Sequence, residues 1–222
     1  MAKRLKVSRK EILNEPDQFL TGSEKALLFF MKNRGSTIGS IAGIIMVGLS
    51  ITGFNYYQET QTLKNEAFYF QMEKIVADSK GPTTDVRSVW EKIGDGYQKE
   101  RATLLLADNH FQKQEYDIAE GLYSSVMDNS TPEQINYQMA QVGLGFIYEA
   151  NKNYKKAIEE FKTVISANTG FPLFEVYWSL SRCHELNNDV SNALLVLREM
   201  QIKFAENPEV EKIEHRIKQL SA

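Results

Sequence analysis

The sequence predicts an all-α protein in which a single N-terminal transmembrane helix is followed by an α-solenoid of repeated helix pairs. Two observations predict this fold class. Residues 35–58 contain no charged side chain, and about 20 such residues in a helix span the hydrocarbon core of a bilayer. After this segment, apolar residues recur at three- and four-residue spacing, as they do in helices, and similar motifs return at intervals of 38 and 36 residues.

Residues 1–34 are expected to form a short basic arm. The arm holds eight Lys or Arg and four Asp or Glu, which gives it a formal charge of +4. Ser8 and Glu11 fit a helix capping box, and the apolar run at residues 26–31 leads toward the uncharged segment. The arm can therefore lie as an amphipathic segment on the membrane surface. It can equally serve only to orient the anchor, and the sequence leaves both interpretations open.

Residues 35–57 are expected to form the transmembrane anchor. A buried soluble helix is a weaker interpretation because the segment is rich in glycine, and each glycine weakens a soluble helix by roughly 1 kcal/mol. A cleaved signal peptide is also disfavoured. Its charged leader would occupy residues 1–34, and no small-x-small cleavage site follows the densest apolar stretch, residues 41–49. The pattern therefore favours an uncleaved, single-pass anchor.

The distribution of charge predicts the orientation of this anchor. The eight basic residues of the arm compare with three in residues 55–80. The positive-inside rule then places the N-terminus in the cytoplasm and the C-terminal domain outside, which in a bacterial inner membrane is the periplasm. Residues 35–222 carry a formal charge of −7, which with the +4 of the arm gives the −3 of the whole chain. An acidic outer domain argues against nucleic acid as a partner.

Small residues inside the anchor are spaced as in closely paired membrane helices. Gly35, Gly39 and Gly43 recur every four residues, which is the small-xxx-small spacing that lets two helix backbones approach. We expect these glycines to mediate helix pairing with another membrane segment. The alternative is a glycine-rich span that has no partner.

Residues 58–222 are expected to fold as one helical repeat domain. Its clearest unit reads Leu144-Gly145-x-x-Tyr148, followed by Ala157 and Phe161. These spacings match the signature of the tetratricopeptide repeat. Gly145 and Ala157 are small enough for two paired helices to approach, and Tyr148 and Phe161 fill the space beside them.

Further copies of this signature divide the domain into units. We expect repeat units at about 66–98, 100–132, 138–170 and 174–206, and a capping helix at 209–220, because repeat arrays need capped ends. The first unit is degenerate. The second unit carries Leu106, Ala107, His110, Ala119 and Tyr123 at the signature positions, and the fourth carries Leu180, Ser181, His184, Ala193 and Leu197.

The sequence offers little that resembles catalytic or metal-binding chemistry. Two of the three histidines, His110 and His184, occupy the aromatic position of the signature, so helix packing explains them better than catalysis does. His215 is the third, and Cys183 is the only cysteine, which excludes an intrachain disulfide. We find no metal-ligand spacing and no phosphate-binding loop. We therefore expect no enzyme activity, no cofactor, no metal and no small-molecule substrate.

The first helices of the repeat units are expected to line a protein-binding groove. In this architecture positions 2, 5, 9 and 12 of each first helix face the concave side. Position 5 gives an apolar row across three units, and such exposed apolar patches mark interaction sites. The alternative is that the long helix after the membrane, or the capping helix, folds back and buries the row. The expected groove residues are Arg101, Leu104, Asp108, Phe111, Met139, Val142, Phe146, Trp178 and Arg182, with Glu149 at the rim.

Taken together, the basic arm, the single anchor and the signature residues Leu144, Gly145, Tyr148, Ala157 and Phe161 resemble the YfgM-like family of ancillary SecYEG translocon subunits. The resemblance implies a periplasmic tetratricopeptide-like domain. It also implies three kinds of partner: the SecYEG translocon, a membrane-anchored PpiD-like chaperone, and proteins emerging into the periplasm.

Two classes of function follow from these features. One is a chaperone-like accessory factor that binds many unfolded clients through the apolar groove, and the sequence favours this class. The other is a structural scaffold subunit that holds one cell-envelope or secretion assembly. The sequence does not name the partner, the oligomeric state or the set of clients.

Overall fold

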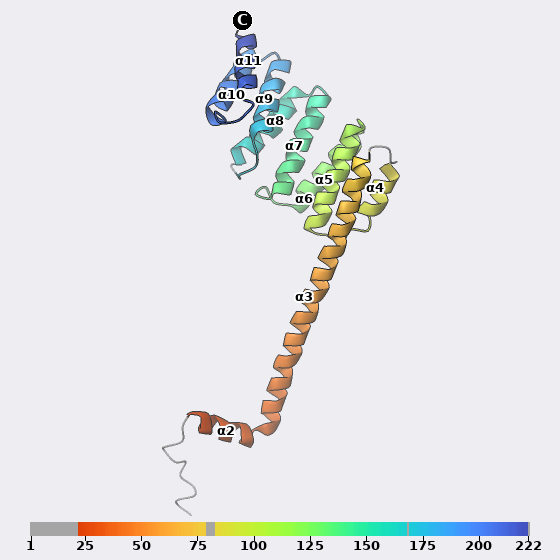
Figure 1. Ribbon diagram of the computed structural model, residues 1–222, viewed down its shortest axis with the longest axis vertical. Coiled ribbons are helices and arrows are strands. Elements are labelled where there is room, and N and C mark those ends of the chain that lie inside the picture. Colours follow the sequence, from red (N-terminus) through yellow and green to blue (C-terminus); the bar gives the residue numbers. More distant parts are fainter. Residues whose placement is uncertain (1–21, 79–82, 168, 222) are drawn as a thin grey trace, which may run out of the picture. The chain divides into compact units, whose positions relative to one another are not determined.

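The computed structural model describes residues 22–78, 83–167 and 169–221, without the side chains of residues 23–25 and 83–85. The capping-box pattern at residues 8–11, with most of the basic arm, lies outside these residues. Within them, every regular element is a helix (Figure 1). The predicted all-α fold class is therefore confirmed. The chain forms two compact units that meet between Glu59 and Thr60, and each is described separately.

The first unit contains helix α2 (Gly22–Lys32) and the first part of helix α3 (Arg34–Ala77). α3 has 44 residues, which at 1.5 Å per residue gives a length of about 66 Å. Among the described helices, α3 is the one long and apolar enough to cross a membrane, judged by length and composition. The expected anchor at 35–57 lies inside α3. The helix continues past it because the next glycine and proline are Gly81 and Pro82.

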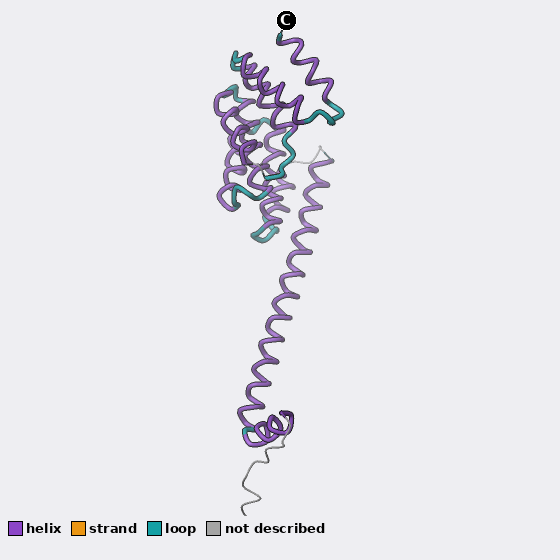
Figure 2. The backbone as a smooth tube through the Cα atoms, turned by 90° about the vertical axis from the view of Figure 1, so that its left-hand side faces the viewer, coloured by secondary structure: helices purple, strands orange, loops and turns teal. Residues whose placement is uncertain are grey.

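The second unit begins at Thr60 and consists of helices that pack on their neighbours in chain order (Figures 1 and 2). The end of α3 is followed by α4 (Thr83–Trp90), and the last helix is α11 (Val210–Leu220). Between them lie three helix pairs, which are α5 (Tyr97–Gln112) with α6 (Tyr116–Asn129), α7 (Ile135–Ala150) with α8 (Tyr154–Ala167), and α9 (Phe174–Leu186) with α10 (Val190–Lys203).

The signature residues build the core of each helix pair. Ala119, Ala157 and Ala193 stand at the same signature position, and none of the three has any exposed surface. The large residues four positions later are buried as well, and they are Tyr123, Phe161 and Leu197. Each small residue allows the second helix to approach the first, and each large residue then fills the space between helices. The structure therefore shows the packing that the sequence predicts, with a small residue and a large residue of each second helix buried against the first helix.

Two glycines of α7 mark the closest helix contacts. A Cβ atom placed on Gly145 would lie 2.5 Å from Cε1 of Phe161 on α8. A Cβ atom on Gly143 would lie 2.5 Å from Cζ of Tyr123 on α6. Gly145 thus sets the spacing within one helix pair, and Gly143 sets the spacing between that pair and the preceding one. The repeat signature contains the first glycine but not the second.

The turns inside the three helix pairs share one hydrogen-bonding pattern. Gln114, Lys152 and Asn188 each adopt a positive φ, of 63°, 61° and 61°. The next residue in each turn donates its backbone N–H to a carbonyl five residues earlier. These bonds join Glu115 to His110 at 3.0 Å, Asn153 to Tyr148 at 2.7 Å and Asp189 to His184 at 2.8 Å. The pattern is a Schellman motif, which satisfies carbonyl groups at the end of the first helix and reverses the chain.

The contact at Gly145 predicts opposite effects for two glycine-to-alanine changes. Gly145→Ala should lower the free energy of unfolding by about 1–3 kcal/mol because the new methyl group overpacks against Phe161. The control is Gly121→Ala in α6, where no side chain and no other helix lies within 4 Å of the added Cβ. This change should raise stability by up to about 1 kcal/mol because alanine favours a helix. Thermal unfolding followed by circular dichroism measures both, and equal effects would contradict the proposed contact.

Candidate protein-binding face

The α7 helix presents one stripe of residues that the sequence assigned to the groove. Met139, Val142, Phe146 and Glu149 are spaced by three, four and three residues, so they lie along one side of the helix. Met139 is 43% exposed. Val142 and Phe146 are partly buried against the core cluster of the last repeats. The Phe146 ring lies 5.5 Å from the Phe161 ring in an edge-on contact. The stripe is therefore apolar and partly accessible.

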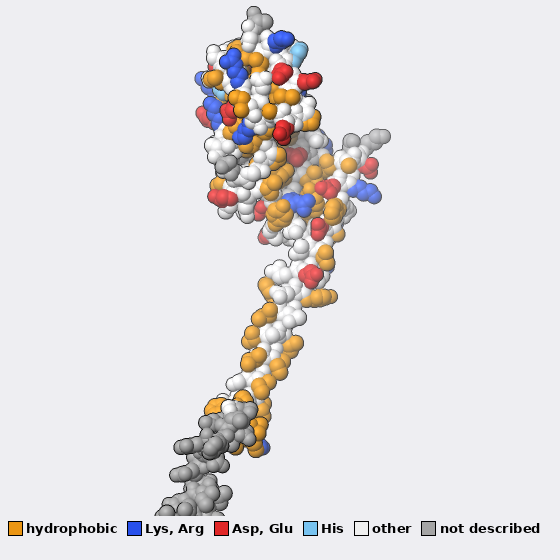
Figure 3. All heavy atoms as spheres, turned by 60° about the vertical axis from the view of Figure 1, so that its left-hand side comes forward, with side chains coloured by type: hydrophobic (Ala, Val, Ile, Leu, Met, Phe, Trp, Pro, Cys, Tyr) orange, Lys and Arg blue, Asp and Glu red, His pale blue; other side chains and the backbone are white. Residues whose placement is uncertain are grey.

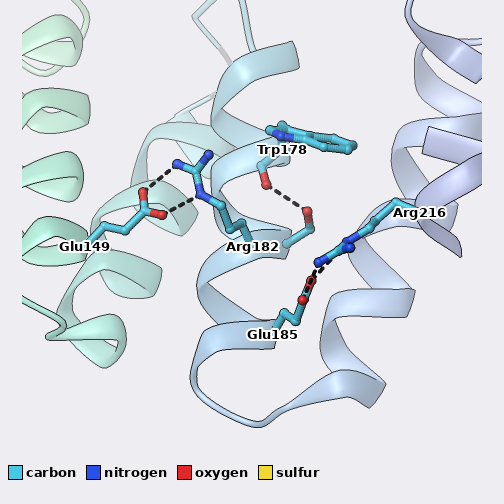
Figure 4. A network of polar contacts seen from close by, with 6 residues as sticks. Glu149, Trp178, Arg182, Glu185 and Arg216 are labelled. Atoms are coloured by element: carbon cyan, nitrogen blue, oxygen red, sulfur yellow. Dashed lines mark hydrogen bonds and ion pairs between the residues drawn. The ribbon is translucent and has the colours of Figure 1, made fainter. Parts of the chain in front are cut away.

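An ion pair joins this stripe to the next first helix. Arg182 of α9 donates to both carboxylate oxygens of Glu149, over 2.5 and 2.7 Å (Figure 4). The Glu149 side chain is only 11% exposed. The hydrogen bonds to its carboxylate raise the pKa of the Arg182 guanidinium. This bidentate ion pair links α7 directly to α9.

The last helix, α11, partly covers the other groove residue of α9, Trp178. The Nζ atom of Lys212 lies 4.5 Å from the centre of the Trp178 ring, which is a cation–π contact. Nearby, Arg216 of α11 bonds both carboxylate oxygens of Glu185 on α9 (Figure 4). A pocket of about 240 Å³ remains between the helices, lined by Trp178, Arg182, Lys212 and Arg216 among others. Trp178 is therefore half-buried, and part of its ring surface stays accessible.

Leu104 departs from the expected apolar row. It is 4% exposed and belongs to the core cluster that includes Ala140 and Leu144 of α7. The reason is the direct packing of α5 against α7, which is reinforced where Asn136 donates to Glu100 over 2.9 Å. The expectation that Leu104 is available in a groove does not fit this burial, and Leu104 is a core residue.

The remaining expected residues of α5 make contacts inside the second unit. The Arg101 guanidinium lies 4.1 Å from the centre of the Tyr69 ring on α3. Asp108 accepts a hydrogen bond of 2.5 Å from the Tyr123 hydroxyl, and burial raises the pKa of both groups. The Phe111 ring packs 5.5 Å from the Tyr116 ring across the turn of its own repeat. The α5 end of the expected groove is thus more filled than the α7 and α9 end.

These contacts define a smaller surface, which we call the α7–α9 face. It consists of Met139, Val142, Phe146, Glu149, Trp178 and Arg182. In the view of Figure 3, hydrophobic and charged side chains are mixed over the visible side of the second unit. The residues that sequence reasoning missed are Lys212 and Arg216 of α11. The sequence predicts α11 itself, but its apolar stripe does not indicate which polar side chains reach back to α9.

The glycines expected to pair membrane helices lie in the first unit. Gly35, Gly39 and Gly43 are spaced along α3, and apart from the adjoining turns of the α3 backbone, nothing described lies within 4 Å of a Cβ placed on any of them. A second helix backbone therefore has room to approach this stripe.

The histidine and cysteine side chains of α9 are held in the interior. Cys183 is fully buried, and burial raises the pKa of its thiol to about 12, far from the thiolate that nucleophilic chemistry needs. His184 is buried, and its Nδ1 lies 3.1 Å from Oδ2 of Asp189 in the following turn. His110 makes the equivalent contact with Glu115 over 2.5 Å. Among the described residues, no cluster of His, Cys, Asp and Glu is arranged to hold a metal ion.

Comparison with known families identifies the repeat domain. A family described as a tetratricopeptide repeat-like domain matches residues 28–169, well over half of the chain. The protein belongs to this family. The match begins within α2, so the family unit includes the long apolar part of α3 together with α4 and the first two helix pairs of the second unit.

A curated relative and two solved structures extend this comparison. The chain is 26% identical over 176 residues to a Neisseria gonorrhoeae protein named ancillary SecYEG translocon subunit, covering 75% of this chain and 83% of the relative. The resemblance expected from sequence is thus confirmed. Two structures of kinesin light chain TPR-like repeats from Podosopora anserina, one of them a point variant, superpose with a TM-score of 0.58 at 15% identity. They cover 71% of this chain and 85% and 84% of their own chains, which shows the fold alone.

The burial of His184 predicts a pH-dependent stability. Burial lowers the pKa of His184 below its usual value, against a raising contribution from Asp189. As the pH falls through about 6.5, the unfolded chain takes up a proton at this site before the folded chain does. Stability should therefore decrease with falling pH. His184→Tyr, which installs the residue that α7 carries as Tyr148, should reduce this slope in urea unfolding measured between about pH 7.5 and 5.5. An unchanged slope would contradict the assignment.

Proposed function

We propose that this protein is a membrane-anchored, protein-binding accessory subunit of the Sec translocon, with a chaperone-like action on emerging polypeptides. The observation that carries the proposal is the combination of a tetratricopeptide repeat-like domain with similarity to an ancillary SecYEG translocon subunit over most of both chains. The expected partners are the SecYEG translocon, a PpiD-like chaperone and secreted clients.

The proposed topology places the N-terminus in the cytoplasm and the repeat domain in the periplasm. The long apolar helix α3 supports a single-pass anchor in a bacterial inner membrane. The excess of basic residues before the anchor supports the orientation, because basic flanks are retained on the cytoplasmic side. This topology brings the repeat domain to the side of the membrane where secreted proteins emerge.

The proposed binding surface is the α7–α9 face, with Arg101, Asp108 and Phe111 at its α5 edge. Its charged members are already paired, since Glu149 binds Arg182. A ligand therefore finds apolar side chains such as Met139 and Trp178 rather than unpaired charges. This favours extended or helical apolar segments over a ligand with one fixed pattern of charge.

A structural scaffold in a cell-envelope or secretion assembly is the second candidate function. The accessible stripe Gly35, Gly39 and Gly43 favours it, because such a stripe suits one defined helix partner in the membrane. A scaffold would hold a single partner, whereas a chaperone-like subunit would contact many.

Photo-crosslinking in intact cells distinguishes these functions. A photoreactive amino acid at Met139 or Trp178 should give many crosslinked products, including translocon subunits, because clients differ in size. The matched control is Lys162, which is exposed on α8 outside the α7–α9 face. One discrete product would favour the scaffold. Absence of any product from both positions would contradict binding at this face.

Trp178→Ala should reduce the yield of the products formed from Met139 by about tenfold, since central tryptophans contribute strongly to protein interfaces. The variant should remain folded because Trp178 is only partly buried. Far-UV circular dichroism checks the fold. Equal yields from the folded variant and the parent protein would contradict the role of Trp178.

A further inference from the structure

The part of α3 that belongs to the second unit is apolar on two opposite sides. One side packs into the repeat domain. Met72 has no exposed surface, and Phe68, Tyr69 and Val76 pack around it against the core of α4 and α5. The Asn65 carboxamide oxygen on the same side accepts a hydrogen bond of 3.1 Å from the Gly94 backbone N–H. This side of α3 is therefore occupied by contacts with other parts of the second unit.

The other side carries Leu63, Ala67 and Phe70. At about 100° per residue these side chains point about half a turn away from Met72. Leu63 is 61% exposed and Phe70 is 58% exposed. Large apolar side chains on the solvent side of a helix are expected to have a partner. A helix that only capped the repeat array would need polar residues here.

The spacing of this exposed stripe is that of a coiled coil. Leu63, Ala67 and Phe70 are separated by four and three residues, and the seven-residue step from Phe70 to Leu63 continues back to Tyr56 and Leu49 in the sequence. No charged residue interrupts these positions until Lys74. One core position of this heptad is apolar from Leu49 to Phe70, and the small residues Thr60 and Ala67 occupy the other core position between Tyr56 and Phe70. A large apolar residue at every seventh position predicts supercoiling with a second helix.

We propose that the stripe Leu63, Ala67 and Phe70 pairs with the same stripe of a second copy of this chain, forming a parallel two-stranded coiled coil. Two copies anchored in one membrane by the same N-terminal helix have their α3 helices parallel. In this register Glu59 and Lys64 flank the stripe five residues apart, which is the spacing at which flanking residues of opposite strands meet. Glu59 of each copy thus faces Lys64 of the other, and two ion pairs favour the homodimer over an unrelated helix.

Disulfide crosslinking of the purified full-length protein in lipid vesicles tests this dimer. In a Cys183→Ala background, Leu63→Cys should give a product of twice the monomer mass on oxidation. The matched control is Thr62→Cys, which is the adjacent residue on α3 and is also exposed, but points away from the stripe. Its yield should be at least about tenfold lower. Equal yields from the two positions would overturn the proposal, because they would indicate random collision.

Charge reversal then tests the register and the identity of the partner. Glu59→Lys or Lys64→Glu alone should reduce the Leu63→Cys product, since like charges then face each other, and the double exchange should restore it. Failure of the double exchange to restore the product would overturn the parallel register. In native membranes, a Leu63→Cys product whose mass fits a different protein, in place of the dimer, would overturn the assignment of the partner. Neither result bears on crosslinking from Met139, so the dimer and the proposed function fail separately.

Discussion

The close approach of the two helices in each repeat is the constraint on which the rest of the second unit depends. It requires a residue no larger than alanine at one position of each second helix, and Ala119, Ala157 and Ala193 supply it. In the middle pair, α7 also needs a glycine at position 145, because a Cβ atom there would overlap the Phe161 ring. With this distance fixed, α5 packs against α7, and the ion pair between Glu149 and Arg182 links α7 to α9.

Side chains with a polar group stand at equivalent positions of the three first helices, immediately before Leu104, Val142 and Trp178, and each one makes a hydrogen bond to another helix. Thr103 accepts a hydrogen bond from the Trp90 indole over 2.9 Å, Gln141 donates to Glu160 over 3.2 Å, and the Tyr177 hydroxyl donates to Glu199 over 2.6 Å. All three residues are buried, and a buried polar group without a partner would destabilise the fold. These bonds therefore satisfy the buried polar groups and add specific contacts between the helices.

The sequence predicts the repeat units well because their packing is local. Leu144, Gly145 and Tyr148 lie within one helix, and Ala157 and Phe161 follow in the next, so their spacing alone indicates the contact. The surface is harder to predict. The burial of Leu104 depends on how closely α7 approaches α5, and the cover over Trp178 depends on the direction in which α11 returns. Both are set by contacts between elements distant in sequence, such as Asn136 with Glu100 and Arg216 with Glu185.

The continuity of α3, in contrast, has a local origin, since no proline lies between the apolar segment 35–57 and the expected start of the first repeat unit, and residues 55–66 contain no glycine. A helix that has already been nucleated extends at little cost through such residues, so one helix replaces the two expected segments.

The shallow shape of the α7–α9 face also limits the kind of ligand it suits. The pocket beside Trp178 has a volume of about 240 Å³, less than the roughly 300–1,000 Å³ of typical small-molecule sites. Met139, Val142 and Phe146 add contacts along α7 without enclosing a cavity. A chain segment laid across such a surface gains many small apolar contacts and remains accessible to water, and the cost of immobilising it offsets much of that gain. Binding of this kind is expected to be weak and quickly reversible, which is compatible with the chaperone-like action proposed above.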